Sequence, residues 1–196
     1  VLVDSEGTVS NDLAGSGREV PSFATRNAAV EYCESQLISA YGSELVLPDT
    51  MEPIDSPALN QLAPEDAQAV QDLMEERVYD DGDVVRRVGQ RFGGVFFIVS
   101  GMIATSMPAP DGSRIKLTTL GPGMTFGEMA LGTDKRQETT VKAAGQVRLK
   151  VLTAEAMEQL EEENPRLAVE LWKALTRDAY TRVEQYIRES ALRAMD

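Results

Sequence analysis

Hydrophobic and polar positions divide the chain into three stretches with different periods. Over residues 1–41, short apolar runs alternate with helical spacing, and over residues 77–153 short apolar runs are separated by glycine turns. From residue 154 onward, apolar residues recur every three or four positions. Because strands repeat every two residues and helices every 3.6, the pattern predicts a short α/β segment, then a β domain, then helices.

The N-terminal stretch predicts strands over 1–3 and 19–23 and helices over 9–14 and 25–41. Thr25 suits the N-cap of the second helix. Its apolar face consists of Val30, Cys33, Leu37 and Ala40. Such a face is typical of core packing, so Cys33 is expected to pack and not to react.

A boundary is expected after this segment, because residues 43–63 are rich in proline and acids, as in a linker. Pro64 suits the first position of a helix over 64–74. We therefore predict an α/β segment over 1–42, a linker over 43–63 and a second domain over 64–196.

Seven short strands are predicted in the middle of the chain, with glycine turns between them. They span 77–79, 84–88, 95–99, 102–107, 115–120, 140–143 and 147–152. Regular spacing of short strands indicates an antiparallel β-roll, jelly-roll-like, with flanking helices, in the α+β class. The candidates for its interior are Val85, Phe97, Val99, Ile103, Leu117 and Leu149.

Two helices close the chain. The first is predicted over 154–163, and Asn164-Pro165 then supplies an N-cap and an N1 proline for a second helix over 165–194. A helix of this length often packs on its own domain at its start and on a partner at its end. A homodimer contact through this C-terminal helix is therefore one hypothesis.

The loop over 126–143 carries most of the chemical information. Gly127 lets the backbone approach a ligand closely, and residues 128–131 can form one helical turn whose free amides face a phosphate. Glu128 offers a carboxylate on one side of the turn, and Arg136 is the nearest arginine on the other. This arrangement suits a ligand with hydroxyls at one end and a phosphate at the other.

Three segments in this order resemble the cyclic nucleotide-binding domain family, over about residues 56–190. They are 79–85, an early turn before a strand; 96–101, a central strand ending in glycine; and 126–131, the phosphate-binding cassette. The resemblance implies a β-roll and a regulatory domain that binds cAMP or cGMP and passes the signal to an attached domain. It implies no catalysis, no cofactor and no metal.

In the family, a glutamate accepts hydrogen bonds from the ribose 2′-hydroxyl, backbone amides hold the phosphate, and an arginine neutralises it. Glu128, Gly127 and Ala130 match these positions. The arginine position falls on Gln137, followed by Glu138, while Arg136 lies one residue early. The implied ligand-binding residues are Gly127, Glu128, Met129, Ala130, Leu131, Arg136, Gln137, Thr139 and Thr140.

Two alternatives follow from the departure at Gln137 and Glu138. In the first, the loop shifts by one residue, Arg136 turns inward, and nucleotide still binds. In the second, the fold is degenerate, no longer binds nucleotide, and serves as an interaction or dimerisation domain. Aromatic residues of the last helix, Trp172, Tyr180 or Tyr186, are candidates to cover the base, although Trp172 is better explained by packing.

Charge and composition narrow the classes of function. The formal charge of −13 argues against a nucleic-acid partner, because phosphate neutralisation supplies most of that affinity. The absence of histidine excludes histidine-dependent hydrolases and most zinc sites, and the lone cysteine indicates a reducing compartment. The acids Asp80, Asp81 and Asp83 are more typical of a solvated turn than of a metal site.

Residues 26–37 resemble the last helix of a STAS domain of the kind that precedes a cyclic nucleotide-binding domain. The resemblance implies that the α/β segment over 1–42 is the C-terminal part of a STAS-like domain. Such tandems occur at the C-terminal end of sulfate-permease-type anion transporters and of some glutaminases. The resemblance implies an attached transporter or enzyme domain and a cytoplasmic location, with the possibility of a tether to the inner face of the membrane. The initial Val1 also suggests a piece of a larger protein.

Overall fold

The computed structural model describes residues 2–3, 21–23, 29, 32–33, 36, 49–91, 93–109, 114–128, 136 and 138–194. The chain forms two compact units, Val1–Leu47 and Pro48–Asp196.

The first unit contains two short parallel strands, β1 (Leu2–Val3) and β2 (Ser22–Phe23). Ala29, Tyr32, Cys33 and Gln36 are helical. The ring of Phe23 lies 5.1 Å from that of Tyr32, so strand and helix are in contact. Parallel pairing of two strands requires a crossover between them, as the α/β pattern predicts. The predicted helix over 9–14 lies outside the described residues.

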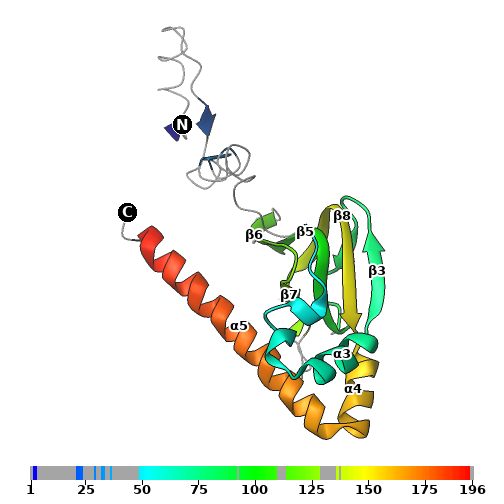
Figure 1. Cartoon of the computed structure of the whole chain (residues 1–196). Helices are drawn as coiled ribbons and strands as arrows, with labels where there is room; N and C mark the ends of the chain where they lie inside the picture. Colours follow the sequence, from blue (N-terminus) through cyan, green and yellow to red (C-terminus); the bar gives the residue numbers. More distant parts are fainter. Residues whose placement is uncertain are drawn as a thin grey trace, which may run out of the picture. The chain divides into compact units, whose positions relative to one another are not determined.

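The second unit is built on six antiparallel strands (Figure 1). They are β3 (Glu75–Tyr79), β4 (Val84–Arg86), β5 (Val95–Pro108), β6 (Arg114–Leu120), β7 (Thr125–Phe126) and β8 (Thr140–Leu152). The sheet order is β3-β8-β5-β6, with β4 paired to β8 and β7 paired to β5. The predicted antiparallel roll is confirmed.

Strands β5 and β8 each merge two predicted strands into one. The predicted breaks contain Gly101 and Gly145, and both adopt positive φ, 81° and 83°. The register shifts around Ser100, so the backbone bulges while the ladder continues on both sides. A Cβ at Gly101 would lie 2.2 Å from the carbonyl oxygen of Gln146, which makes glycine necessary there.

Helices cover one side of the roll. They are the short 3₁₀ turns η1 (Pro53–Asp55) and η2 (Leu59–Gln61), and α3 (Pro64–Asp72), α4 (Ala154–Glu163) and α5 (Pro165–Ala194). The predicted bounds of α4 and α5 are confirmed, whereas α3 ends two residues earlier than predicted. Asn164 Oδ1 accepts a hydrogen bond from the Leu167 amide at 3.2 Å, as expected of the N-cap of α5.

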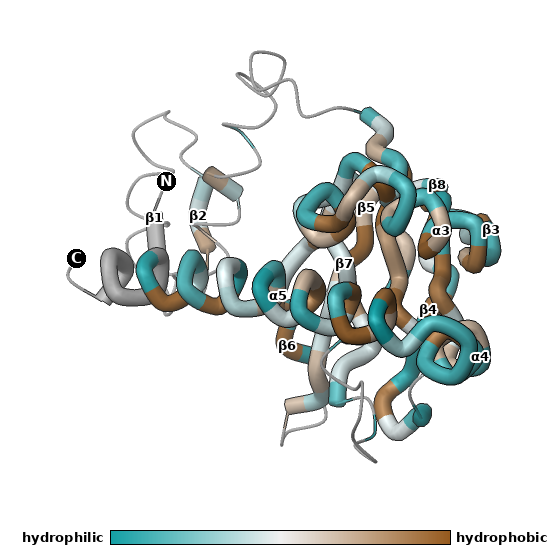
Figure 2. Tube along the Cα trace, turned by 60° about the horizontal axis from the view of Figure 1, so that its bottom comes forward, coloured by the Kyte–Doolittle hydropathy of each residue, from teal (hydrophilic) through white to brown (hydrophobic). Residues whose placement is uncertain are grey.

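Side chains of β5 alternate between two buried clusters. Val95 and Phe97 pack with α3, α4 and α5, whereas Phe96 and Ile98 face the interior of the roll. Phe97 was therefore assigned to the wrong side of the strand, because a run of five apolar residues conceals the alternation. Figure 2 shows this hydrophobic layer between roll and helices.

Of the other residues predicted to lie in the interior, all but Leu117 are buried. Val85, Ile103 and Leu149 lie inside the roll, and Val99 is buried. Leu117 is 45% exposed, contrary to prediction, because β6 pairs only with β5 and its side chains face solvent almost throughout.

Leu171 joins α5 to the rest of the second unit and is fully buried. We expect Leu171→Ala to lower the free energy of unfolding by about 2–5 kcal/mol, because it removes buried methyl groups and leaves a cavity. Denaturant unfolding measures the change. Gln185→Ala is the control on the same helix, since Gln185 is exposed, and should change stability by about 0.5 kcal/mol or less.

Candidate functional site

The predicted cassette begins at a tightly packed turn. β7 pairs with β5, and the rings of Phe126 and Phe96 stack with centroids 4.6 Å apart. The next residue, Gly127, has φ of 96°, and a Cβ there would lie 2.5 Å from the carbonyl oxygen of Gly94. Only glycine fits this approach without displacing the backbone. The sequence therefore fixes the direction in which the chain leaves the roll.

Glu128 follows this turn directly. Its side chain is 11% exposed, and its Oε1 accepts a hydrogen bond from Nη2 of Arg182 at 2.6 Å. Its second oxygen, Oε2, is buried and has no hydrogen-bond partner among the residues that the structure describes. An unpartnered buried carboxylate oxygen is unfavourable, so this atom is the natural acceptor for a donor supplied by a ligand.

Arg182 brings α5 to the cassette. Its Nη1 donates to the carbonyl oxygen of Thr125, and its Nη2 also lies 3.3 Å from Oδ2 of Asp178. The Thr125 hydroxyl donates to the same Asp178 oxygen at 3.3 Å. These contacts link α5 to the segment formed by β7 and Glu128, although α5 lies more than fifty residues later in the chain.

The site holds two buried carboxylates against one guanidinium. Burial raises the pKa of Glu128 above its ordinary value, and the positive charge of Arg182 opposes this rise without cancelling it. The nearby Asp178 carboxylate raises the pKa further. A proton or a neutral donor therefore binds Glu128 more favourably than at an exposed glutamate.

The remaining predicted ligand-binding residues are partly placed. Arg136 is exposed and donates from Nη1 to the carbonyl oxygen of Gly89 at 2.9 Å. Thr139 is half-buried, and Thr140 is buried at the start of β8. Glu138 is exposed. Met129, Ala130, Leu131 and Gln137 lie outside the described residues.

Three residues of this cluster were not found from the sequence: Thr125, Asp178 and Arg182. A signal for two of them was present, because Asp178 and Arg182 continue the core-facing line of Leu171 and Leu175 at helical spacing. Charged residues on an otherwise apolar helix face are typical of a paired buried site.

The aromatic candidates on α5 are not part of this cluster. Trp172 packs against the helical core, and its Nε1 donates to Glu161 at 2.9 Å, which supports the packing interpretation. Tyr180 and Tyr186 are each 69% exposed.

The acids near residue 80 stabilise turns. Asp83 Oδ2 accepts a hydrogen bond from the Asp80 amide, and Asp81 Oδ1 accepts one from the Gly145 amide. Within the described ranges, no group of three or more acidic, cysteine or histidine side chains is arranged to hold a metal ion. Among the helices that the structure describes, none is both long and apolar enough to span a membrane.

Comparison with protein-family models identifies the class. Residues 76–164 match the model of the cyclic nucleotide-binding domain, which includes the turn at Gly127 and Glu128. Together with the antiparallel roll and its flanking helices, this match shows that the second unit contains a cyclic nucleotide-binding regulatory domain. The match begins after the first unit, so the STAS resemblance there stays a prediction.

Individual relatives place the domain in several contexts. Glutaminase 1 of Bradyrhizobium diazoefficiens is 31% identical over 114 residues, covering 58% of this chain and 18% of the relative. The type II regulatory subunit of Drosophila melanogaster cAMP-dependent protein kinase is 30% identical over 105 residues, covering 53% of this chain and 28% of the relative. The chain thus spans less than a third of either protein.

Among solved structures, a cyclic nucleotide-binding domain from Methylobacillus flagellatus superposes with a TM-score of 0.60. It is 18% identical, and the match covers 65% of this chain and 72% of that one. The similarity shows the fold.

The pH dependence of stability tests the electrostatics of Glu128. Because the folded-state pKa of Glu128 is raised, the native protein loses stability as pH rises from the ordinary glutamate pKa, about 4.3, through the raised value. Glu128→Gln has no such titration, so without ligand it should be more stable than the native protein at neutral pH. Thermal unfolding across pH measures the difference, which should shrink toward pH 4. A variant that is less stable at neutral pH, with a deficit that grows as pH rises, would contradict this account.

Proposed function

We propose that the second unit is a regulatory module that binds a cyclic nucleotide, cAMP or cGMP, and relays occupancy to an attached domain. The observation that carries the proposal is the buried Glu128 carboxylate: Arg182 holds one oxygen, and the other has no partner within the described part of the chain. A ribose hydroxyl supplies the missing donor. No bond is made or broken, so the module is a binding domain and not an enzyme.

The relay follows from the same contacts. A hydroxyl donor at Oε2 of Glu128 competes with Arg182 for the negative charge of the same carboxylate, and Arg182 lies on α5. Ligand binding therefore alters the tie between the cassette and the C-terminal helix. Such a differential contact is what a ligand needs in order to shift a protein between two states.

Phosphate recognition is the weaker half of the site. The arginine of the family pattern is replaced by Gln137, and Arg136 donates to Gly89. Because a charge-assisted hydrogen bond contributes about 1.5–3 kcal/mol, its loss weakens binding by roughly ten- to over a hundredfold. We therefore propose that the native domain binds cyclic nucleotides more weakly than a member that has the arginine.

Titration calorimetry of the protein with cAMP and cGMP tests ligand binding. We expect saturable binding of at least one of them, and loss of that binding in Glu128→Ala, because the sugar loses its acceptor. Glu158→Gln removes an exposed acid on α4 and is the matched control, so its affinity should be unchanged. If neither nucleotide binds at millimolar concentration, the sensor proposal fails.

Restoring the arginine tests the phosphate half. Gln137→Arg should tighten binding by roughly ten- to a hundredfold, because it adds a charge-assisted hydrogen bond to the phosphate. Gln137→Lys supplies the charge without the planar fork and should give a smaller gain. If Gln137→Arg leaves the affinity unchanged, the phosphate does not lie at this position of the loop.

The attached domain is proposed from the resemblances. The STAS-like pattern of the first unit favours an anion transporter of the sulfate-permease type, which would hold the module at the cytoplasmic face of the membrane. The glutaminase relatives favour an enzyme in the same position. In both cases we propose a cytoplasmic location.

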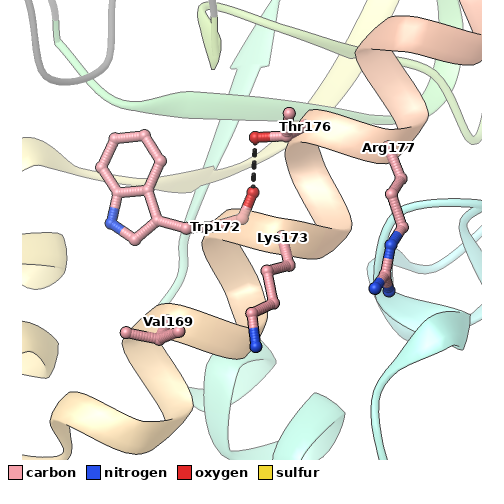
Figure 3. A pocket seen from close by; sticks show the side chains of 5 residues that line it. All are labelled: Val169, Trp172, Lys173, Thr176 and Arg177. Atoms are coloured by element: carbon pink, nitrogen blue, oxygen red, sulfur yellow. Dashed lines mark hydrogen bonds between the residues drawn. The ribbon is translucent and has the colours of Figure 1, made fainter.

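A second candidate function, dimerisation, is favoured by the outer face of α5. This face carries four large apolar residues that are about half exposed or more: Val169, Tyr180, Val183 and Ile187. Together with Trp172 and Thr176 they form a line at three- and four-residue spacing along the helix. Figure 3 shows the N-terminal part of this line, where the residues lining a shallow groove all come from α5. Figure 1 shows the C-terminal turns of α5 extending beyond the roll.

A second copy of the chain fits this face in an antiparallel arrangement. Lys173 and Arg177 flank the line in its first half, and Glu184 flanks it on the same side in its second half. Pairing Val169 with Ile187 of a copy would place Lys173 beside Glu184 of that copy, so opposite charges meet. The occupant proposed for this face is therefore another α5.

Sedimentation equilibrium tests the dimer. Val169→Glu with Ile187→Glu should shift the protein from dimer to monomer, because these two positions face each other across the proposed contact and two buried carboxylates would meet there. Thr181→Glu adds a charge on the same helix away from the line and should leave the dimer intact. A native protein that is monomeric at about 100 μM would rule out the arrangement.

A further inference from the structure

We propose that Asp178 is a positioning residue, which orients the Arg182 guanidinium against Glu128 from within α5. It makes no contact with the ligand itself. The effect on affinity rests on the proposed function, whereas the effect on Glu128 can be measured without ligand.

Asp178 is unusual because it is a carboxylate on the buried face of a helix. It is 9% exposed and lies one turn before Arg182. Its contacts to Arg182 and to the Thr125 hydroxyl are both 3.3 Å, which is long for charge-assisted interactions. Burying a carboxylate for two weak contacts is a poor way to stabilise a fold, and an apolar residue would serve packing better. Its placement suggests a role other than stability.

The geometry of Arg182 shows what that role is. Nη1 donates to the Thr125 carbonyl oxygen, while Nη2 lies between Glu128 Oε1 at 2.6 Å and Asp178 Oδ2 at 3.3 Å. Three acceptors therefore fix the plane of the guanidinium. Asp178 is the acceptor that belongs to the same helix, so it restrains the arginine even when Glu128 moves.

This restraint matters because an arginine side chain loses rotamer entropy when it is held in one geometry. Asp178 holds the arginine before a ligand arrives, so less entropy is lost on binding. Thr125 completes the arrangement, since its hydroxyl donates to Asp178 and its carbonyl accepts from Arg182. Thr125, the residue before Phe126-Gly127-Glu128, thus links the cassette to α5.

Asp178 could act on Glu128 in two ways, by positioning Arg182 or only as a nearby negative charge. The two roles predict opposite changes in the pKa of Glu128 when Asp178 is replaced. Three groups act on Glu128: Arg182, Asp178 and its own backbone amide. If Asp178 were only a nearby negative charge, Asp178→Asn would lower the pKa of Glu128. If Asp178 holds Arg182 in place, the variant releases the arginine and the pKa of Glu128 rises.

Carbon-13 NMR titration of the side-chain carboxyls in ligand-free protein measures this sign. We expect a higher pKa for Glu128 in Asp178→Asn than in the native protein, and a smaller change in the same direction in Thr125→Val. Asparagine keeps the size of aspartate and loses its charge, so the fold is retained while the ion pair to Arg182 is removed. Thr125→Ser gives a second test in which the native pKa should be kept. An unchanged or lowered pKa in Asp178→Asn overturns the proposal.

A double-mutant cycle on cAMP affinity provides the second measurement. Asp178→Asn and Arg182→Gln should each weaken binding by about tenfold, and the double variant should be no weaker than Arg182→Gln alone, because Asp178 acts only through Arg182. Additive losses would overturn the proposal, as would an unchanged affinity in Asp178→Asn. If the native protein binds neither nucleotide, the proposed function fails while the titration still decides the role of Asp178.

Discussion

The contact between Arg182 and Glu128 joins the two parts of the domain that a ligand switch must connect. Glu128 lies two residues after the short strand β7. The positive φ of Gly127 and the stacked rings of Phe96 and Phe126 fix its position. Arg182 lies on α5, whose first turns are buried against β5, α3 and α4. Because both ends are anchored by packing, the relay proposed above runs from the Glu128 carboxylate to α5.

The electrostatic state of this contact explains why the site suits a hydroxyl donor. Two buried carboxylates share one guanidinium, and one oxygen of Glu128 has no partner. A neutral donor satisfies that oxygen without adding charge. The phosphate side is different, because Arg136, the arginine nearest to the family position, is exposed and donates to Gly89. Under the proposed function, the sugar side of the site is therefore better equipped than the phosphate side.

Most of the fold was predictable from the sequence because its signals are local. Glycine turns marked the strands, and Asn164-Pro165 marked the start of α5. Two kinds of error occurred. The glycines at 101 and 145 predict strand ends, whereas in the structure the β5–β8 pairing continues on both sides of a bulge. Phe97 lies in a continuous apolar run, which does not show that its side chain faces the helices. In both cases pairing partners distant in sequence decide the outcome, and local pattern does not reveal them.

The site was only half predictable for the same reason. Gly127 and Glu128 lie together in one motif, whereas Arg182 and Asp178 reach them from a helix more than fifty residues later. Hydrogen exchange with and without saturating cAMP tests the central claim most directly. The account predicts that nucleotide changes exchange both at residues 125–128 and on α5 around Arg182. Saturable binding that alters the cassette and leaves α5 unchanged would contradict it.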